Sequence, residues 1–331
     1  MRLCSDAWVG SHEPPCRASG VCRTAGAVYS TSRMIRILGT IFAGLLGLAF
    51  GSFLNVCLSR WPEGESVVSP RSHCRNCDHT LAWWENIPLL SWLALRRRCR
   101  NCNAAISWRY PLVELAIGSL WATTVWSLSQ SLSEATIPSS YFYETTARAI
   151  GKLIFFWLVV ALAALDAEYL WLPNLITLPG IALGFCFTTL TPALRNLASS
   201  EPHKLTIGFE IEVRLPAELL GILAAPALIL LIRWIYWLIR RREGIGLGDA
   251  KLMALLGAWL GLPGALLAFG IGAVLGAIVA LVALAVPAAR RESDSWAAAK
   301  FPLGTFLCIG GIASSLWGQQ IIPAYFRWIG L

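Results

Sequence analysis

The chain has 331 residues, of which 56% are hydrophobic and 14% are charged, and its mean hydropathy is +0.60. A soluble domain carries about 25% charged residues, so this composition excludes an ordinary soluble protein and indicates an integral membrane protein. The formal net charge of +8 raises the question of nucleic-acid binding. However, the Arg and Lys residues gather at the ends of apolar runs, where membrane topology places them, and no aromatic stacking platform accompanies them. We therefore expect no nucleic-acid partner.

Residues 1–36 form a polar N-terminal extension. Its first 33 residues include Cys4, Cys16 and Cys22 and show no periodicity. A cleaved signal peptide is disfavoured, because the apolar run that follows is too long and has no A-x-A site. Met34 stands almost directly before that run. We expect the extension to be a disordered tail or the product of an upstream start codon.

Eight apolar runs approach the length of about 20 residues that a membrane-spanning helix needs. They cover residues 37–59, 111–128, 150–165, 175–194, 217–239, 252–262, 265–287 and 305–322. The sixth is short and can merge with the seventh around residues 261–264. The sequence thus predicts an all-α polytopic membrane protein with about eight transmembrane helices. Its predicted parts are the first helix (37–59), a loop domain (60–110) and a second transmembrane domain (111–331).

The loop charges predict the orientation of these spans. Arginine and lysine cluster in segments 60–109, 240–251 and 290–300. With eight spans and an external N-terminus, all three clusters fall in the cytoplasm, as the positive-inside rule requires. The segments near 129–149 and 195–216 then lie outside.

Two C-x-x-C knuckles lie in the first predicted cytoplasmic loop. They are Cys74, Cys77, Cys99 and Cys102, with 21 residues between the knuckles. Four thiolates in this spacing match a structural tetrahedral zinc site. Disulfides are disfavoured in a reducing cytoplasm, and redox pairs rarely occur as two matching knuckles. His73 and His79 flank the first knuckle as competing ligands, although surface histidines are commoner. The loop buries little, so we expect zinc to supply its stability.

Two aspartates at the edges of apolar runs are the candidate catalytic residues. Asp166 ends the run 150–165, and Asp249 lies in G-I-G-L-G-D-A-K-L. A carboxylate near the hydrocarbon costs several kcal/mol unless it is paired, protonated or hydrated, so it marks a functional site. Two close carboxyls that share one proton can activate water and protonate a leaving amine. The predicted membrane topology places both aspartates on the cytoplasmic side. Glu168 is a rival that points elsewhere if its segment is helical.

The same residues also have simpler interpretations. Asp249 can cap a helix after a flexible loop, and Asp166 can cap the turn at residues 173–174. Gly246 and Gly248 are expected to allow a backbone conformation closed to bulkier residues and the close approach of another segment. Lys251 is either a positive-inside residue or a charge that tunes the aspartates or holds a substrate carbonyl.

Further motifs extend along the chain. They are G-S-F-L-N-V at 51–56, S-P-R-S-H-C-x-x-C at 69–77, E-N-I-P-L-L-S-W at 85–92, R-Y-P-L-V-E at 109–114 and G-L-G-D-A-K-L at 246–252. With the knuckles and the Asp166 motif, they resemble the bacterial type IV prepilin peptidases, which are GxGD-type intramembrane aspartic proteases, over about residues 36–315. The chain departs from the family pattern at Glu85 and Asn174, where the family often has Asp, and in P-L-G-T at 302–305, which replaces F-G-P.

This resemblance implies that Asp166 and Asp249 are catalytic. It implies an enzyme that removes the short basic leader of type IV prepilins and pseudopilins at the cytoplasmic face of the bacterial inner membrane. Many members then N-methylate the new terminus, so S-adenosylmethionine is an expected cofactor beside structural zinc. No glycine-rich dinucleotide fingerprint locates its pocket. The alternative is a zinc-knuckle membrane transporter or assembly factor that uses the aspartates as ion ligands.

Overall fold

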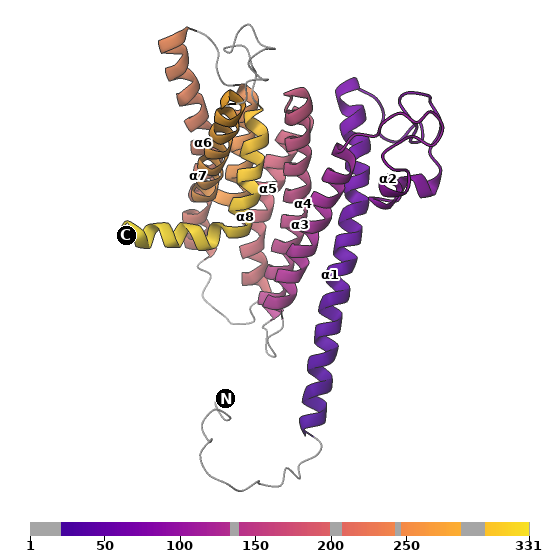
Figure 1. Cartoon of the computed structure of the whole chain (residues 1–331). Coiled ribbons are helices and arrows are strands. Elements are labelled where there is room, and N and C mark those ends of the chain that lie inside the picture. Colours follow the sequence, from indigo (N-terminus) through magenta and orange to yellow (C-terminus); the bar gives the residue numbers. More distant parts are fainter. Residues whose placement is uncertain (1–20, 133–138, 199–206, 242–245, 286–301, 331) are drawn as a thin grey trace.

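The computed structural model describes residues 21–132, 139–198, 207–241, 246–285 and 302–330. Residues 1–20 of the predicted extension and the predicted basic cluster 290–300 lie outside these ranges. The long helices are α1 (Val21–Arg60), α3 (Arg109–Ser131), α4 (Ser139–Tyr169), α5 (Asn174–Ala198), α6 (Ile207–Arg240), α7 (Leu247–Ala285) and α8 (Leu303–Trp328). Every long element of the described residues is helical, so the all-α prediction is confirmed (Figure 1).

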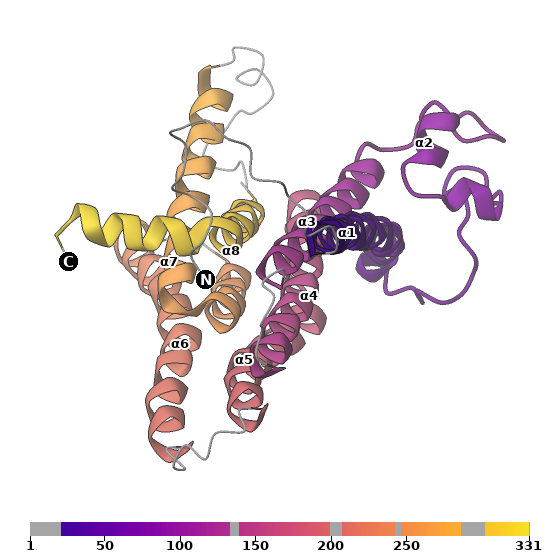
Figure 2. The same ribbon diagram turned by 90° about the horizontal axis from the view of Figure 1, so that it is seen from below.

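A small module interrupts the helices between α1 and α3. It contains the 3-10 turns η1 (Trp61–Glu63) and η2 (Trp83–Asn86) and the short helix α2 (Leu90–Ala94). We call residues 61–108 the module. Figure 2 shows it on the far side of α1 from α6, α7 and α8.

Six helices of the described residues are long and apolar enough to cross a membrane. These segments are Arg33–Glu63, Arg109–Ser131, Tyr141–Tyr169, Asn174–Thr191, Leu219–Arg240 and Leu247–Val282. The first five coincide with the first five predicted spans. The sixth joins two predicted spans, 252–262 and 265–287, into α7. The predicted span 305–322 lies in α8, which is not among the six. α1 begins at Val21, so residues 21–36 of the predicted extension belong to this helix.

The first part of α7 runs alongside α5. At its start, the Lys251 ammonium donates to Asn174 Oδ1 over 2.7 Å. Two turns further on, the Thr188 hydroxyl lies 3.4 Å from the Ala258 carbonyl oxygen. Because Asn174 begins α5 and Thr188 lies deeper in it, this part of α7 runs away from the end at which α5 begins.

The second part of α7 returns toward that end along α8. The Ser314 hydroxyl donates to the Gly264 carbonyl over 2.8 Å, and Gly272 packs against the backbone of Phe306, near the start of α8. Between the two parts, Gly261 has φ 66° and ψ 176°, which an L-residue with a side chain rarely adopts. Gly261 therefore reverses α7 into two limbs, and the sixth and seventh predicted spans are these limbs.

Small residues bring α6, α7 and α8 into close contact. A Cβ atom added at Gly257 would lie 2.2 Å from the Gly221 carbonyl oxygen, and one added at Gly310 would lie 2.1 Å from the Ala268 carbonyl oxygen. In lipid no hydrophobic force drives helices together, so van der Waals packing at such small residues must do so. These glycines hold the second half of the bundle together.

α4 is the central helix of the bundle. In its membrane-length window, 61% of the residues are buried, the largest share of the six helices, and Phe155, Phe156 and Leu162 are fully buried. Polar contacts place the C-terminal ends of α1 and α4 beside the N-terminal ends of α3 and α8. We call this the module end, because the module attaches there (Figure 1).

Candidate active site and metal site

Asp166 lies at the module end of α4, one turn before this helix ends at Tyr169. It is only 5% exposed. The backbone N–H of Thr305, in the first turn of α8, donates to Asp166 Oδ2 over 2.6 Å. A Cβ atom added at Gly304 would lie 2.9 Å from the Asp166 carboxyl carbon. The start of α8 thus fits directly over this carboxyl group, and free N–H groups at a helix start favour such an acceptor.

Asp249 lies in the first turn of α7 and is 9% exposed. Its carboxylate accepts a hydrogen bond from the backbone N–H of Gly246, as a first-turn acid does when it reaches back to cap its own helix. Asp249 is therefore not the N-cap residue of α7, which begins at Leu247, although its carboxylate reaches back to the backbone just before the helix. This hydrogen bond leaves most of the acceptor capacity of the carboxylate free, because the group has a second oxygen and several further acceptor sites.

The Asp166 and Asp249 carboxylates are near enough for their charges to interact. Cys308, which is fully buried on α8, is near enough to interact electrostatically with both. The structure thus brings Asp166 and Asp249 together from helices that are far apart in sequence. The alternative in which Asp166 caps the turn at residues 173–174 is wrong, because its side chain accepts from Thr305 instead.

The residues around Asp249 take partly unexpected roles. Among the described glycines, positive φ occurs at Gly64, Gly261 and Gly330. The expected special conformation at Gly246 and Gly248 was therefore wrong. The predicted close approach of another segment is correct for Gly248, since an added Cβ would lie 3.1 Å from the Leu172 side chain. Lys251 points to Asn174, where its ammonium donates to Oδ1.

The four cysteines of the two knuckles gather in the module. Their sulfur atoms all lie within 4.8 Å of one another. The Cys74–Cys102 sulfurs are 3.8 Å apart, and the Cys77–Cys99 sulfurs are 4.0 Å apart. Four thiolates about 2.3 Å from a tetrahedral zinc ion would stand about 3.8 Å from one another. The donor set and its spacing therefore fit a tetrahedral metal ion.

The two knuckles support the cluster in the same way. Asn76 Nδ2 lies 3.6 Å from the Cys102 sulfur, and Asn101 Nδ2 lies 3.6 Å from the Cys77 sulfur, so each knuckle donates to a thiolate of the other. A backbone hydrogen bond at Ala104 lowers the pKa of the Cys102 thiol to about 6. Such donors stabilise thiolates, the form that binds metal.

The flanking histidines are not part of this cluster. The His79 ring nitrogen Nε2 lies 3.7 Å from Glu85 Oε2, and His73 Nδ1 lies 3.1 Å from the Arg71 carbonyl oxygen. Glu85 itself is buried and accepts from the backbone N–H of Ala82.

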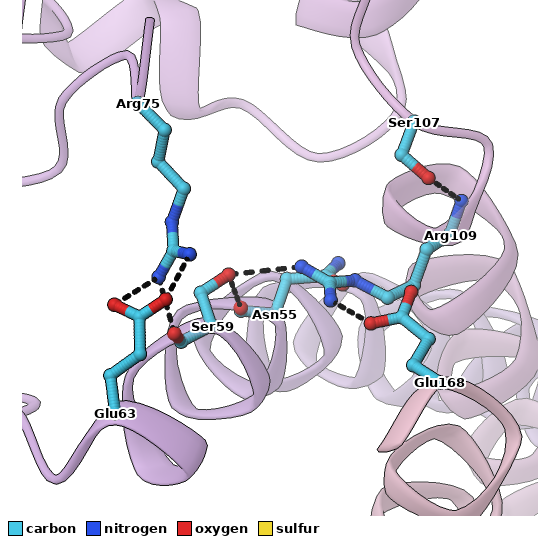
Figure 3. A network of polar contacts seen from close by, with 7 residues as sticks. All are labelled: Asn55, Ser59, Glu63, Arg75, Ser107, Arg109 and Glu168. Atoms are coloured by element: carbon cyan, nitrogen blue, oxygen red, sulfur yellow. Dashed lines mark hydrogen bonds and ion pairs between the residues drawn. The ribbon is translucent and has the colours of Figure 1, made fainter.

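A polar network connects the module with the end of α4 (Figure 3). Arg75 pairs with Glu63 and donates to the Ser59 carbonyl, while Arg109 Nη2 donates to the Ser59 hydroxyl over 2.9 Å. Arg109 also forms an ion pair with Glu168, two residues after Asp166. The carboxylate of Glu168 is thus engaged by Arg109, which argues against Glu168 as a rival to Asp166.

Several of these residues were not predicted from the sequence. Thr305 belongs to the P-L-G-T segment, whose sequence alone predicts no contact with Asp166. Arg109 was counted as a positive-inside charge. The available signal was position, since each residue lies in the first turn of a helix.

Comparisons with known proteins agree with this arrangement. Residues 45–128 match the family described as bacterial peptidase A24 N-terminal domain, and residues 153–281 match the type IV leader peptidase family. Proteins named prepilin leader peptidase/N-methyltransferase from Stutzerimonas stutzeri, Pseudomonas putida and Burkholderia pseudomallei are 30%, 32% and 34% identical to the chain. These alignments cover 87%, 87% and 84% of this chain and 93%, 94% and 85% of the relatives. No solved structure matches. The first family contains the module and the second both aspartates, and we conclude that the chain belongs to the type IV leader peptidase family.

Proposed function

We propose that this protein is a membrane aspartic endopeptidase that removes the basic leader of type IV prepilins and pseudopilins, with Asp166 and Asp249 as the catalytic pair. One observation carries the proposal. Two buried carboxyl groups, on different helices, lie near enough for their charges to interact, at the module end of a bundle whose helices are long enough to cross a membrane. The printed names of the relatives support the substrate class.

The pair performs general acid–base catalysis. One ionised aspartate takes a proton from water as the water oxygen attacks the scissile carbonyl carbon. The other, protonated aspartate donates a hydrogen bond to the carbonyl oxygen, on which negative charge develops. When the tetrahedral intermediate collapses, the C–N bond breaks and the leaving amine nitrogen takes up the proton of the second aspartate, while the first aspartate keeps the proton that it took from water. Two carboxyls that lie close together disfavour double ionisation, so we expect this pair to titrate as a unit.

Neighbouring groups orient the pair. The N–H of Thr305 holds Asp166 Oδ2, and the N–H of Gly246 holds the Asp249 carboxylate. Lys251 stands two residues after Asp249 in the same helix, and its ammonium donates to Asn174 Oδ1 over 2.7 Å. In this position its ammonium can also hold a substrate carbonyl.

The membrane face follows from charge. The module carries Arg96, Arg97, Arg98 and Arg100 among its exposed residues, and cytoplasmic loops are the ones rich in Arg. We therefore place the module end, and the aspartates with it, at the cytoplasmic face of the inner membrane. A basic leader that stays in the cytoplasm while its apolar helix inserts brings the scissile bond to this depth.

The metal in the module is proposed to be zinc with a structural role. Four thiolates close the coordination shell and leave no position for substrate. Zinc bound there would replace the small hydrophobic core that so polar a segment cannot form. The cysteines would thus stabilise the fold of the module, and with it the polar network around Arg109.

N-methylation of the new terminus is proposed as a second activity, from the printed names of the relatives. S-adenosylmethionine would supply the methyl group. A cavity beside the module does not fit this cationic donor, because Arg60 and Arg71 line it and no acidic residue does. We derive no transfer step from it.

The test is a mass spectrum of a substrate's N-terminus. A synthetic prepilin with its leader and first apolar segment is incubated with the purified, metal-loaded protein in detergent. Cleavage should follow a glycine and leave a new amine, which gains the mass of one CH₂ group when S-adenosylmethionine is added and methyl transfer occurs. An intact substrate with folded wild-type protein would overturn the proposal.

A further inference from the structure

A cavity of ≈ 450 Å³ lies between α1 and the module, away from the paired aspartates. Its lining residues are Ala49, Ser52, Phe53, Val56, Arg60, Val67, Val68, Pro70, Arg71, Ser72, Asn86 and Pro88. The module side of α1 is remote from α6, α7 and α8 (Figure 2), so the cavity is separate from the proposed catalytic centre.

One wall of the cavity is a stripe along α1. Ala49, Phe53, Val56 and Arg60 follow one another at spacings of three or four residues, which places them on one face of the helix. Ala49 and Phe53 are exposed, Val56 is half-buried and Arg60 is buried. From Ala49 to Arg60 the helix rises about 16 Å, at about 1.5 Å per residue. The stripe thus has an open apolar end, at the exposed residues Ala49 and Phe53, and a closed cationic end, at the buried Arg60 next to the module.

Arg60 carries a buried charge without an acidic partner. It is 5% exposed, and its guanidinium donates to the carbonyl oxygens of Ser66 over 2.8 Å and Pro70 over 2.6 Å. The ion pairs found among the described residues do not include Arg60. A guanidinium has five N–H donors, so donors remain for a ligand in the cavity. Burial of an unpaired charge is costly, and an anion would offset that cost.

The rest of the lining favours the same kind of ligand. Arg71 adds a second positive charge, Ser52, Ser72 and Asn86 add polar groups, and no acidic residue lines the cavity. Arginine is well suited to phosphate, because its planar fork donates two hydrogen bonds at once.

We propose that this cavity binds an anionic phospholipid, with the phosphate at Arg60 and Arg71 and an acyl chain along Ala49, Phe53 and Val56. The open apolar end of the stripe distinguishes this ligand from free phosphate, which would use only the cationic end. Bound lipid would then clamp the segment around Pro70, whose carbonyl Arg60 already holds, and fix the module to the membrane surface.

The experiment measures lipid binding and stability, not cleavage, so it can fail without affecting the proposed peptidase activity. Purified full-length protein is placed in nanodiscs of phosphatidylcholine with or without phosphatidylglycerol, and retained lipid is identified by native mass spectrometry. Unfolding temperature is followed in detergent with added phosphatidylglycerol, phosphatidylcholine, inorganic phosphate or S-adenosylmethionine. The variants are Arg71→Gln and Arg71→Glu. Arg71 is exposed, so its replacement leaves the fold intact. The matched control is Arg98→Gln, an exposed arginine of the same module outside the cavity.

Wild type and Arg98→Gln should retain phosphatidylglycerol and gain unfolding temperature from it, whereas Arg71→Gln should bind it about ten-fold more weakly, the usual effect of one charged hydrogen bond. Arg71→Glu should lose the preference for anionic lipid. Equal binding of phosphatidylcholine by wild type, or unchanged phosphatidylglycerol binding by both Arg71 variants, would overturn the proposal. Stabilisation by inorganic phosphate to the same extent would show a free-anion site and overturn the lipid assignment, and stabilisation by S-adenosylmethionine alone would reassign the cavity.

Discussion

Thr305 contacts the same oxygen of Asp166 twice, through its backbone N–H at 2.6 Å and its hydroxyl at 3.1 Å. The hydroxyl also lies 3.1 Å from the Ala163 carbonyl oxygen, and it has only one proton to donate. When Asp166 is ionised, the hydroxyl can donate to it. When Asp166 holds a proton, the hydroxyl can accept that proton's hydrogen bond and donate to Ala163. Thr305 therefore suits a carboxyl group that alternates between both states during catalysis.

Replacement of Thr305 tests this role. Thr305→Val keeps the shape and the backbone donor but removes the hydroxyl, so kcat for leader removal should fall about ten-fold, the effect of one neutral hydrogen bond. Thr305→Ser keeps the hydroxyl and should retain most of the activity. Steady-state kinetics with a prepilin peptide measures both. Equal rates for the Val and Ser variants would show that only the backbone N–H matters.

Removal of either proposed catalytic carboxyl should abolish cleavage. Asp166→Asn and Asp249→Asn preserve shape and remove the titratable group, so proton transfer to and from water is lost. The mobility shift of a co-expressed prepilin is the assay, and membrane insertion of each variant is checked by fractionation. Full processing by either purified variant would refute the catalytic assignment.

The ion pair between Arg109 and Glu168 should matter for rate without being essential. Glu168→Gln leaves the Arg109 guanidinium, 14% exposed, without its charged partner, so the unfolding free energy should fall by about 1–3 kcal/mol. Because the pair holds the end of α4 near Asp166, kcat should fall while KM changes little.

The control for that variant lies at the other end of the same helix. Arg148 pairs with Glu144 there, so Arg148→Gln should affect stability without affecting kcat. Complete loss of cleavage in Glu168→Gln, in a folded protein, would return Glu168 to the list of catalytic residues.

The cysteine cluster should bind about one zinc ion per chain. Cys74→Ser or Cys99→Ser should lower the metal content and the unfolding temperature, because each removes one of four ligands. Cys186→Ser, which changes an exposed cysteine outside the cluster, should do neither. Elemental analysis and thermal unfolding measure these effects. A disulfide between Cys74 and Cys77 in freshly isolated cells would contradict the metal site.

The topology can be tested with reporter fusions. Fusions after Arg98 and Arg242 should behave as cytoplasmic, and those near Ser139 and Pro202 as external, from the distribution of loop charges. Arg242 and Pro202 lie outside the described residues. If the Arg98 and Arg242 fusions report opposite sides, the module end is not on one face of the membrane.

Local sequence patterns were enough to predict several parts of this protein. Apolar runs predicted the helices, the spacing of the knuckles predicted the four-cysteine cluster, and aspartates at the ends of apolar runs predicted the pair. Such patterns are readable because helix period, ligand spacing and the cost of a charge near lipid act within a few residues.

The side-chain contacts across the bundle, by contrast, depend on how the helices pack. Thr305 reaches Asp166 over 139 positions and Arg109 reaches Glu168 over 59. Such pairs depend on the rotation and tilt of each helix, which many packing contacts set together. Likewise, the α7 sequence was compatible with a kink or a reversal, and packing of its limbs against α5 and α8 selected the reversal at Gly261. The anion-binding character of the cavity beside Arg60 arises in the same way, because its walls come from α1 and a loop that only folding brings together.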